Sequence, residues 1–418
     1  MSAEGTGPAV LVSCRCQGGI RIAEVKTVPY LTERLQGFGT TIFAAMSELA
    51  VQTQSVNLGQ GFPDTDGPVA VSQAAIDAIE AGHNQYPPLP GIEPLRTAVA
   101  EHRLRFRGQR FDPASEVLIT AGATEALAAT LLSLTGPGDE VVTFEPYYDS
   151  YAAGIAMSGA QRRVVTLRGR GFAFDPDELE AAFTPNTKLM LLNSPHNPTG
   201  KVFSRSELEA IARACIDNDV IAVTDEVYEH LVFDNTEHIP LATLPGMAER
   251  TVTISSAGKI FSFTGWKIGW ACGPAELINA VRTAKQFLTF VSGAPLQPAV
   301  AVGLRLGDGF FDGYTAQMQS KRDRFVDGLV AAGFDVTVPQ GTYFVTADIT
   351  PLGETDGTAF CMSLPKRCGV VAVPTQVFYD NPETGRRLVR FAFCKRDEVL
   401  DEACRRLQQL SRSAAGAL

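Results

Sequence analysis

Residues 255–267 read SSAGKIFSFTGWK, and the chain is best interpreted outward from this stretch. Lys259 lies in an uncharged run of small and aromatic residues, with Ser256 three positions before it and Lys267 eight positions after it. Apolar surroundings disfavour the ammonium form, so the amine is more easily neutral and nucleophilic. A lysine that forms a Schiff base with a carbonyl compound needs this property. The alternative is a lysine whose stem is buried at the end of a strand while its charge reaches water.

The lysine stretch ends a repeating pattern of short apolar runs, which occupy residues 117–120, 141–144, 188–192, 220–223 and 251–254. Segments with helical spacing separate these runs. Short, continuously apolar strands that alternate with helices are typical of a mainly parallel sheet covered on both faces. We therefore predict an α/β fold.

Polar or small residues follow each of these strands, and ligands of parallel sheets bind beyond the carboxyl ends of the strands. Residues 121–125 join a strand to a helix, whose first amides have no internal partners and can cradle an anion. Close packing without a ligand is the alternative interpretation of that turn. The residues expected to meet at this edge are Ala123 with Thr124, Tyr148, Asn197, Asp225 with Tyr228, and Lys259.

These groups match the parts of pyridoxal 5'-phosphate. Its phosphate would bind amides and hydroxyls of Ala123, Thr124 and Ser256, with charge from Lys267. Tyr148 offers a flat face for the pyridine ring, although it could instead belong to the core.

The remaining groups fit the chemistry of the ring. Asn197 and Tyr228 can hydrogen-bond its phenolic oxygen, and Asp225 can keep its nitrogen protonated. Lys259 would then act as the base at the substrate Cα. Arg390, a lone guanidinium in the apolar run 388–393, suits bidentate capture of a carboxylate. Capping of a helix by Asp225 and a structural acid paired with Arg390 are the alternatives.

Composition and charge exclude several classes of function. The chain has 418 residues, 45% hydrophobic and 20% charged, which is ordinary for a globular enzyme of two or three structural units. The net charge is −10, so general binding to nucleic acid or to an anionic membrane is not expected. No apolar run approaches the length of a membrane span.

The eight cysteines predict neither a metal site nor a disulfide framework. Cys14 and Cys16 form the one close pair, and no second pair completes a zinc pattern. We expect no metal, reduced thiols and a cytoplasmic location. His102 is interpreted as a packed or interface histidine.

Four segments are expected along the chain. Residues 1–27 read as a loose extension, and residues 28–70 as an arm that includes part of a small domain. Residues 71–305 would form the large domain that binds the cofactor. The pattern changes near residue 310, so residues 306–418 are assigned to the C-terminal part of the small domain.

Residues 193–200, 224–228 and 255–267, together with Arg390, resemble the fold-type-I aminotransferases of class I. Within that family the segments 57–64, 122–126 and 341–344 are similar to the branch of kynurenine and methionine aminotransferases, which includes bacterial N-succinyldiaminopimelate aminotransferases. The resemblance runs from about residue 28 to the C-terminus. It implies a seven-stranded sheet and pyridoxal 5'-phosphate as cofactor.

The resemblance also implies further roles. Gly61 would present its backbone to the substrate carboxylate beside Arg390. Tyr86 would reach the cofactor phosphate of a neighbouring subunit, which implies a homodimer. Position 43 is tryptophan in some relatives, so the shape of the substrate pocket is not simply inherited. The residues expected to line that pocket are Phe43, Phe62, Phe378 and, from the partner, Phe290.

The expected activity is transfer of an amino group from an amino acid to a 2-oxo acid such as 2-oxoglutarate. Candidate donors are N-succinyl-LL-2,6-diaminopimelate, an intermediate of lysine biosynthesis, and aromatic or sulfur amino acids. One alternative is a β-lyase that acts on cysteine conjugates at the same site. A second is a ligand-sensing domain of an aminotransferase-like regulator, which the acidic charge and the short N-terminal segment disfavour.

Overall fold

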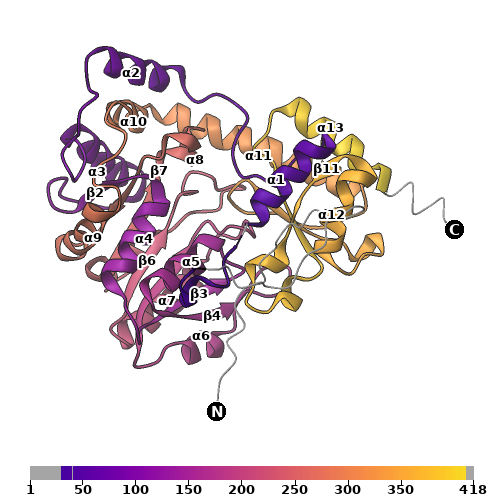
Figure 1. Ribbon diagram of the computed structural model, residues 1–418, viewed down its shortest axis with the longest axis horizontal. Helices are drawn as coiled ribbons and strands as arrows, with labels where there is room; N and C mark the ends of the chain where they lie inside the picture. The colour runs from indigo at the N-terminus through magenta and orange to yellow at the C-terminus, as the bar shows by residue number, and fades with distance from the viewer. Residues whose placement is uncertain (1–29, 40, 411–418) are drawn as a thin grey trace.

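The computed structural model describes residues 30–39 and 41–410 (Figure 1). The extension predicted at residues 1–27, with Cys14 and Cys16, lies outside the described residues. The described chain forms a large sheet covered by helices and, beside it, a smaller α+β unit. Among the described residues, no helix combines the length and the apolarity needed to cross a membrane.

The central sheet has seven strands in the order β2-β8-β7-β6-β5-β3-β4. Neighbouring strands are parallel except where β8 pairs with β2 and with β7. The predicted α/β fold with a mainly parallel, seven-stranded sheet is therefore confirmed. Its strands are β2 (Val117–Thr120), β3 (Glu140–Glu145), β4 (Gln161–Thr166), β5 (Thr187–Asn193), β6 (Ile221–Asp225), β7 (Thr251–Ser256) and β8 (Gly269–Cys272).

Helices cover both faces of this sheet because successive strand residues point to opposite sides. Val141 and Leu189 pack with α4, α5 and α9 on one face. Val142 and Met190 pack with α6 and α7 on the other, and α3 and α10 continue that cover over β2 and β8. These helices are α3 (Glu93–Arg107), α4 (Gly122–Leu134), α5 (Asp149–Ser158), α6 (Pro176–Ala182), α7 (Arg205–Asp217), α9 (Ala275–Leu288) and α10 (Leu296–Leu304).

The smaller unit combines residues from both ends of the described chain. Figure 1 shows α1 (Ile42–Thr53) among the C-terminal helices, and Met46 and Leu58 share a core with residues of the last hundred positions. One antiparallel sheet has the order β12-β13-β10-β9, and β1 pairs with β11 in parallel. The elements are β1 (Val56–Asn57), β9 (Asp335–Thr337), β10 (Phe344–Asp348), β11 (Val370–Val371), β12 (Val373–Pro374), β13 (Leu388–Ala392), α11 (Asp308–Ala331), α12 (Gly357–Cys368) and α13 (Asp397–Leu407).

Two strands of the central sheet, β4 and β8, were not predicted from the apolar runs of the sequence. β4 lies at the edge of the sheet and begins with three polar residues, and β8 is short and begins with glycine. The other elements are α2 (Val69–Glu80), α8 (Ala257–Ile260) and the 3-10 helices η1 (Glu33–Leu35), η2 (Leu241–Thr243), η3 (Ala248–Arg250), η4 (Thr264–Trp266), η5 (Thr350–Leu352), η6 (Thr375–Phe378) and η7 (Pro382–Gly385).

Candidate active site

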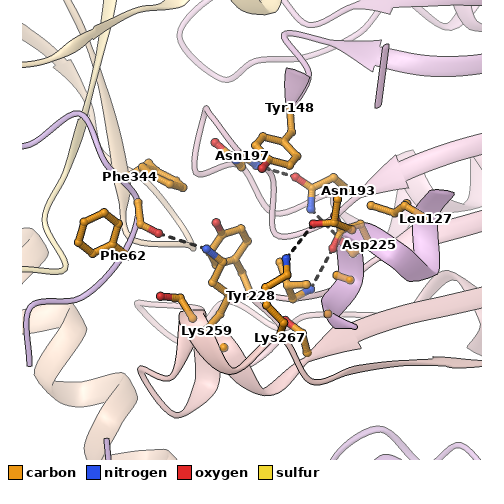
Figure 2. Close-up of a pocket in the computed structure, with 18 of the residues that line it drawn as sticks. Phe62, Leu127, Tyr148, Asn193, Asn197, Asp225, Tyr228, Lys259, Lys267 and Phe344 are labelled. Carbon is orange, nitrogen blue, oxygen red and sulfur yellow. Dashed lines mark hydrogen bonds between the residues drawn. The ribbon is translucent and has the colours of Figure 1, made fainter. Parts of the chain in front are cut away.

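A cavity of about 280 Å³ lies at the carboxyl ends of the central strands, where the smaller unit faces the sheet (Figure 2). Most residues predicted from the sequence line it. They are Phe43, Gly61, Phe62, Ala123, Thr124, Tyr148, Asn197, Asp225, Tyr228, Ser256, Lys259, Lys267 and Arg390. Tyr86, Phe290 and Phe378 are absent from its lining.

Lys259 lies in the short helix α8, directly after β7. Its Nζ donates a hydrogen bond of 3.1 Å to the carbonyl oxygen of Gly61. Burial lowers the pKa of Lys259 to about 8, and Asp225 opposes that shift only in part. A substantial fraction of the amine is therefore neutral near physiological pH, as a nucleophilic lysine requires.

Asp225 is the last residue of β6 and is buried. Its carboxylate accepts hydrogen bonds from the Tyr151 hydroxyl at 2.6 Å and from the Val227 amide at 3.3 Å. Burial nevertheless raises the pKa of Asp225. A positively charged partner in the cavity would stabilise the ionised carboxylate, and the protonated ring nitrogen of a pyridine is such a partner.

The turn between β2 and α4 forms the predicted anion cradle. Gly122 has φ +75°, and a Cβ there would lie 3.2 Å from the Lys267 side chain, so this position favours glycine. The Nζ of Lys267 lies 3.4 Å from Oγ1 of Thr124. A cation, a hydroxyl and the first amides of a helix thus converge at one end of the cavity, as a phosphate group requires.

Arg390 lies on β13 and is 1% exposed. It donates hydrogen bonds of 2.9 Å to Oδ1 of Asn197 and to the carbonyl oxygen of Gly59, while its Nε has no partner. Within the described chain no carboxylate forms an ion pair with Arg390. Burial lowers its pKa to about 10, so the side chain stays charged at neutral pH and is available to an anionic ligand.

Aromatic rings surround the Arg390 guanidinium in place of an acid. Its Cζ lies 4.0 Å from the ring centre of Phe344, 5.1 Å from that of Phe43 and 5.3 Å from that of Phe378. Phe378 therefore lies behind Arg390 and against Phe43, whose ring centre is 5.9 Å away. Phe344 lines the cavity but was not predicted as a site residue, although it belongs to the segment 341–344 that resembles the family branch.

Asn193 and Asn197 organise the loop after β5. The Asn197 amide donates a 2.7 Å hydrogen bond to Oδ1 of Asn193, and the Asn193 side chain donates one of 2.8 Å to the carbonyl oxygen of Asp225. This pair ties the loop to the end of β6. Asn193 and Tyr151 were missed as site residues, since nothing in their spacing distinguishes them from neighbouring polar and aromatic residues.

Tyr86 and Phe290 lie together outside the cavity. Their ring centres are 5.5 Å apart, and the side chains are 82% and 44% exposed. The predicted roles of both residues involve a partner subunit, so these roles stay predictions.

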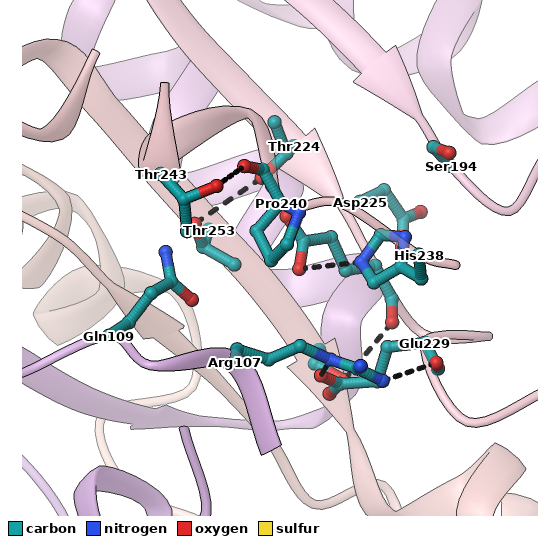
Figure 3. A network of polar contacts seen from close by, with 12 residues as sticks. Arg107, Gln109, Ser194, Thr224, Asp225, Glu229, His238, Pro240, Thr243 and Thr253 are labelled. Carbon is teal, nitrogen blue, oxygen red and sulfur yellow. Dashed lines mark hydrogen bonds and ion pairs between the residues drawn. The ribbon is translucent and has the colours of Figure 1, made fainter. Parts of the chain in front are cut away.

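A second polar cluster lies beneath the turn that follows Asp225 (Figure 3). Arg103 of α3 forms ion pairs with Glu226 at 2.8 Å and Glu229 at 2.6 Å. His238 contacts the same oxygen of Glu226 at 3.1 Å, and Arg107 pairs with Glu229 at 3.2 Å. The turn that positions Asp225 is thus anchored to α3 by buried charge pairs.

The residues of the cavity fit pyridoxal 5'-phosphate. The phosphate cradle, the buried carboxylate of Asp225 and the amine of Lys259 occupy one cavity, with the ring of Tyr148 also in its lining. Arg390 also lines this cavity and has no carboxylate partner in the described chain, so a substrate carboxylate could bind there.

Comparison with known proteins gives consistent results. The family model for aminotransferases of class I and II matches residues 53–407. The chain is 54% identical over 393 residues to a probable N-succinyldiaminopimelate aminotransferase of Mycobacterium tuberculosis, covering 91% of this chain and 99% of that protein. It is 38% identical over 377 residues to the methionine aminotransferase of Escherichia coli, covering 90% and 97%. The solved structure of the Mycobacterium tuberculosis N-succinyldiaminopimelate aminotransferase superposes with a TM-score of 0.89, 55% identity and coverage of 91% and 100%.

Proposed function

This chain belongs to the class I and II aminotransferases, and we propose that its amino donor is N-succinyl-LL-2,6-diaminopimelate and its acceptor 2-oxoglutarate. The choice of donor is supported by the 54% identity to the probable N-succinyldiaminopimelate aminotransferase over nearly the whole length of that protein. The acceptor is chosen because a 2-oxo acid has a carboxylate beside the reacting carbon, which suits the same arginine.

The cofactor of this family, pyridoxal 5'-phosphate, supplies an electron-withdrawing ring that stabilises negative charge at the substrate Cα. We propose that the guanidinium of Arg390 binds the donor's α-carboxylate, with the Gly61 backbone beside it. Asp225 would hold a proton on the ring nitrogen, and Tyr148 would stack on the ring. Asn197 and Tyr228 would hydrogen-bond the ring oxygen.

Lys259 is proposed as the residue that moves a proton at the substrate Cα. A fraction of its amine is neutral at working pH because burial lowers its pKa to about 8. A base whose pKa lies near the working pH transfers protons efficiently in both directions.

One observation favours a second class of donor. The rings of Phe43, Phe62 and Phe344 line the cavity, and the cations in its lining are Lys259, Lys267 and Arg390. Each of these cations already has a proposed role, so an aromatic or sulfur-containing side chain also fits these walls. A β-lyase reaction on cysteine conjugates would use the same residues.

We further propose a cytoplasmic homodimer. The exposed rings of Tyr86 and Phe290 support a subunit interface, and Tyr86 would contact the cofactor phosphate of the partner subunit. The cysteines of the described chain are free thiols, which agrees with a reducing compartment.

A donor screen tests the proposal. The purified protein would be incubated with 2-oxoglutarate and each donor in turn, and glutamate would be measured. We expect the highest kcat/KM with N-succinyl-LL-2,6-diaminopimelate. A higher value with methionine or kynurenine would contradict the proposed donor, and pyruvate and ammonia released from cysteine conjugates without an acceptor would identify the lyase.

A further inference from the structure

The carbonyl oxygen of Gly61 accepts two hydrogen bonds from different parts of the chain. One comes from Nζ of Lys259 at 3.1 Å and the other from the Tyr343 hydroxyl at 2.6 Å. The Nζ of Lys259 also lies 5.7 Å from the ring centre of Tyr343. Tyr343 is therefore a close neighbour of the reactive amine, although it does not line the cavity.

The loop that contains Gly61 is held from the C-terminal side of the smaller unit. The Ala392 amide donates to the carbonyl oxygen of Leu58 at 2.7 Å, and Nζ of Lys395 donates to that of Phe62 at 2.8 Å. In contrast, the Gly61 amide makes no hydrogen bond within the part of the chain that the structure describes. Its neighbours are fixed while this amide remains available to a ligand.

The backbone direction at Gly61 is not set by the residue itself, since glycine lacks the Cβ that restricts φ and ψ. A side chain is excluded here, because a Cβ would lie 2.4 Å from Cζ of Phe344. An external group must therefore hold the Gly61 carbonyl. The Tyr343 hydroxyl makes the shorter of its two hydrogen bonds.

The Tyr343 ring is rigidly placed. It is fully buried and lies edge-on to the ring of Tyr228, with centres 5.2 Å apart and planes at 85°. The preceding Thr342 has φ +66°, and its amide donates to the carbonyl oxygen of Leu231 at 2.9 Å. A strained backbone held by such a contact is a feature found at functional sites.

We propose that Tyr343 is a positioning residue whose hydroxyl holds the Gly61 carbonyl, which in turn places the amine of Lys259 and orients the Gly61 amide toward the substrate carboxylate. Tyr343 thus links the position of the Lys259 amine to that of the Gly61 backbone, which would bind the substrate carboxylate. The inference deepens the proposed function and rests on it, because it takes Lys259 and Gly61 as working parts of an aminotransferase.

The test compares Tyr343→Phe with Tyr314→Phe in the full chain. The Tyr314 hydroxyl donates a 3.0 Å hydrogen bond to the backbone oxygen of Lys259. Tyr314→Phe therefore removes a tyrosine hydroxyl that contacts the same lysine, but not one that contacts Gly61. The first readout is the rate at which pyridoxal 5'-phosphate becomes attached to Lys259 in cofactor-free protein. The second is the affinity of the loaded protein for 3-phenylpropionate, a carboxylate without an amine.

For Tyr343→Phe we expect attachment to slow by about tenfold and the affinity for the carboxylate to fall by about fivefold. Both values should stay within about twofold of the wild type in Tyr314→Phe. With an amino donor, Tyr343→Phe should lower kcat and raise KM together.

Equal effects in the two variants, or unchanged values in Tyr343→Phe, would overturn the proposal. If Tyr343→Phe does not fold, Tyr343→His keeps a polar ring and serves in its place under the same criteria. A wild-type protein that attaches the cofactor but rejects N-succinyl-diaminopimelate would contradict the proposed donor alone, because neither readout uses that donor.

Discussion

The two most deeply buried arginines of the described chain are Arg103, beneath the turn that follows Asp225, and Arg390, in the cavity, with exposed fractions of 0% and 1%. Arg103 has two carboxylate partners, Glu226 and Glu229. Burial alone would lower the pKa of Arg103, but Glu229 and Glu226 raise it overall. Arg390 has no acidic partner in the described chain, and burial lowers its pKa to about 10.

The same contrast separates two consecutive residues, Asp225 and Glu226. Burial raises the pKa of Asp225, which faces the cavity. Burial acts in the same direction on Glu226, but Arg103 and His238 lower its pKa overall. Removing one partner of a buried ion pair destabilises the fold, whereas a buried charge that has no partner indicates where a ligand binds.

The largest effect should distinguish Asp225 from Glu226. Asp225→Asn should reduce kcat by about 10⁴-fold, the upper end of the range for groups that control proton placement. Its cofactor-free form should be at least as stable as the wild type above the unfolded-state pKa of about 3.9, because a raised folded-state pKa makes the ionised carboxylate destabilising there. Steady-state kinetics and thermal unfolding measure the two effects.

Glu226→Gln is the matched control. It should lose stability but retain most of the kcat per folded molecule. A Glu226→Gln variant as inactive as Asp225→Asn would show that both residues serve the chemistry.

The next largest effect concerns Arg103. Arg103→Met leaves Glu226 and Glu229 buried without their main partner and should cost about 3–5 kcal/mol of unfolding free energy. Arg105→Met removes a partly exposed ion pair with Asp308 from the same helix and should cost less than about 1 kcal/mol. Equal losses in urea-induced unfolding would argue against a structural role for the buried pair.

Arg390→Met should have the opposite profile. We expect kcat/KM to fall by about 10²–10³-fold for every α-amino acid, which corresponds to the loss of a buried charged hydrogen bond to the substrate. Its free energy of unfolding should fall by less than that of Arg103→Met, because the acceptors that lose a donor, Asn197 Oδ1 and the Gly59 carbonyl, are neutral. A loss confined to one donor would assign Arg390 to side-chain recognition instead.

The smallest effect is a pH dependence of stability. Burial lowers the pKa of His102 to about 4, and His230 is shifted in the same direction next to Arg103, Arg107 and Glu229. The unfolded chain binds protons below about pH 6.5 while the folded chain does not, so stability should decrease as the pH falls from about 6.5 toward 4, on the order of 1–3 kcal/mol.

His102→Gln should make this dependence less steep when unfolding is measured across the same pH range, while His196, His230 and His238, whose pKa values burial also lowers, preserve the rest of it. A wild-type curve that is flat between pH 6.5 and 4 would contradict the expected neutral state of the histidine pair. The ion pairs of Glu226 and Glu229 act at lower pH, since a lowered carboxylate pKa stabilises the fold until the pH falls through its folded-state value.

The sequence predicted the cavity better than the cluster beneath it. Apolar strands show where their carboxyl ends meet, so Asp225, Lys259 and Asn197 could be placed at one edge without a structure. Arg390 was identified because a guanidinium inside an apolar strand is unusual. These signals are local, and each can be seen within a few residues.

The missed features depend on long-range contacts. Arg103 pairs with residues more than a hundred positions away, and nothing in α3 distinguishes it from exposed arginines such as Arg105. Tyr343 and Tyr151 act through single hydroxyl groups whose targets are defined only by the folded chain. The interpretation of His102 as a packed histidine is confirmed, since the side chain is buried and its Nε2 lies 2.8 Å from Nε2 of His230.

The central claim is that the amine of Lys259 is the point of attachment for the cofactor. Purified protein would be incubated with pyridoxal 5'-phosphate, reduced with borohydride, digested and examined by mass spectrometry. The account predicts a pyridoxyl group on the peptide that contains Lys259, and none in Lys259→Ala. Modification of another lysine in the wild type, such as the buried Lys285, with Lys259 unmodified, would contradict it.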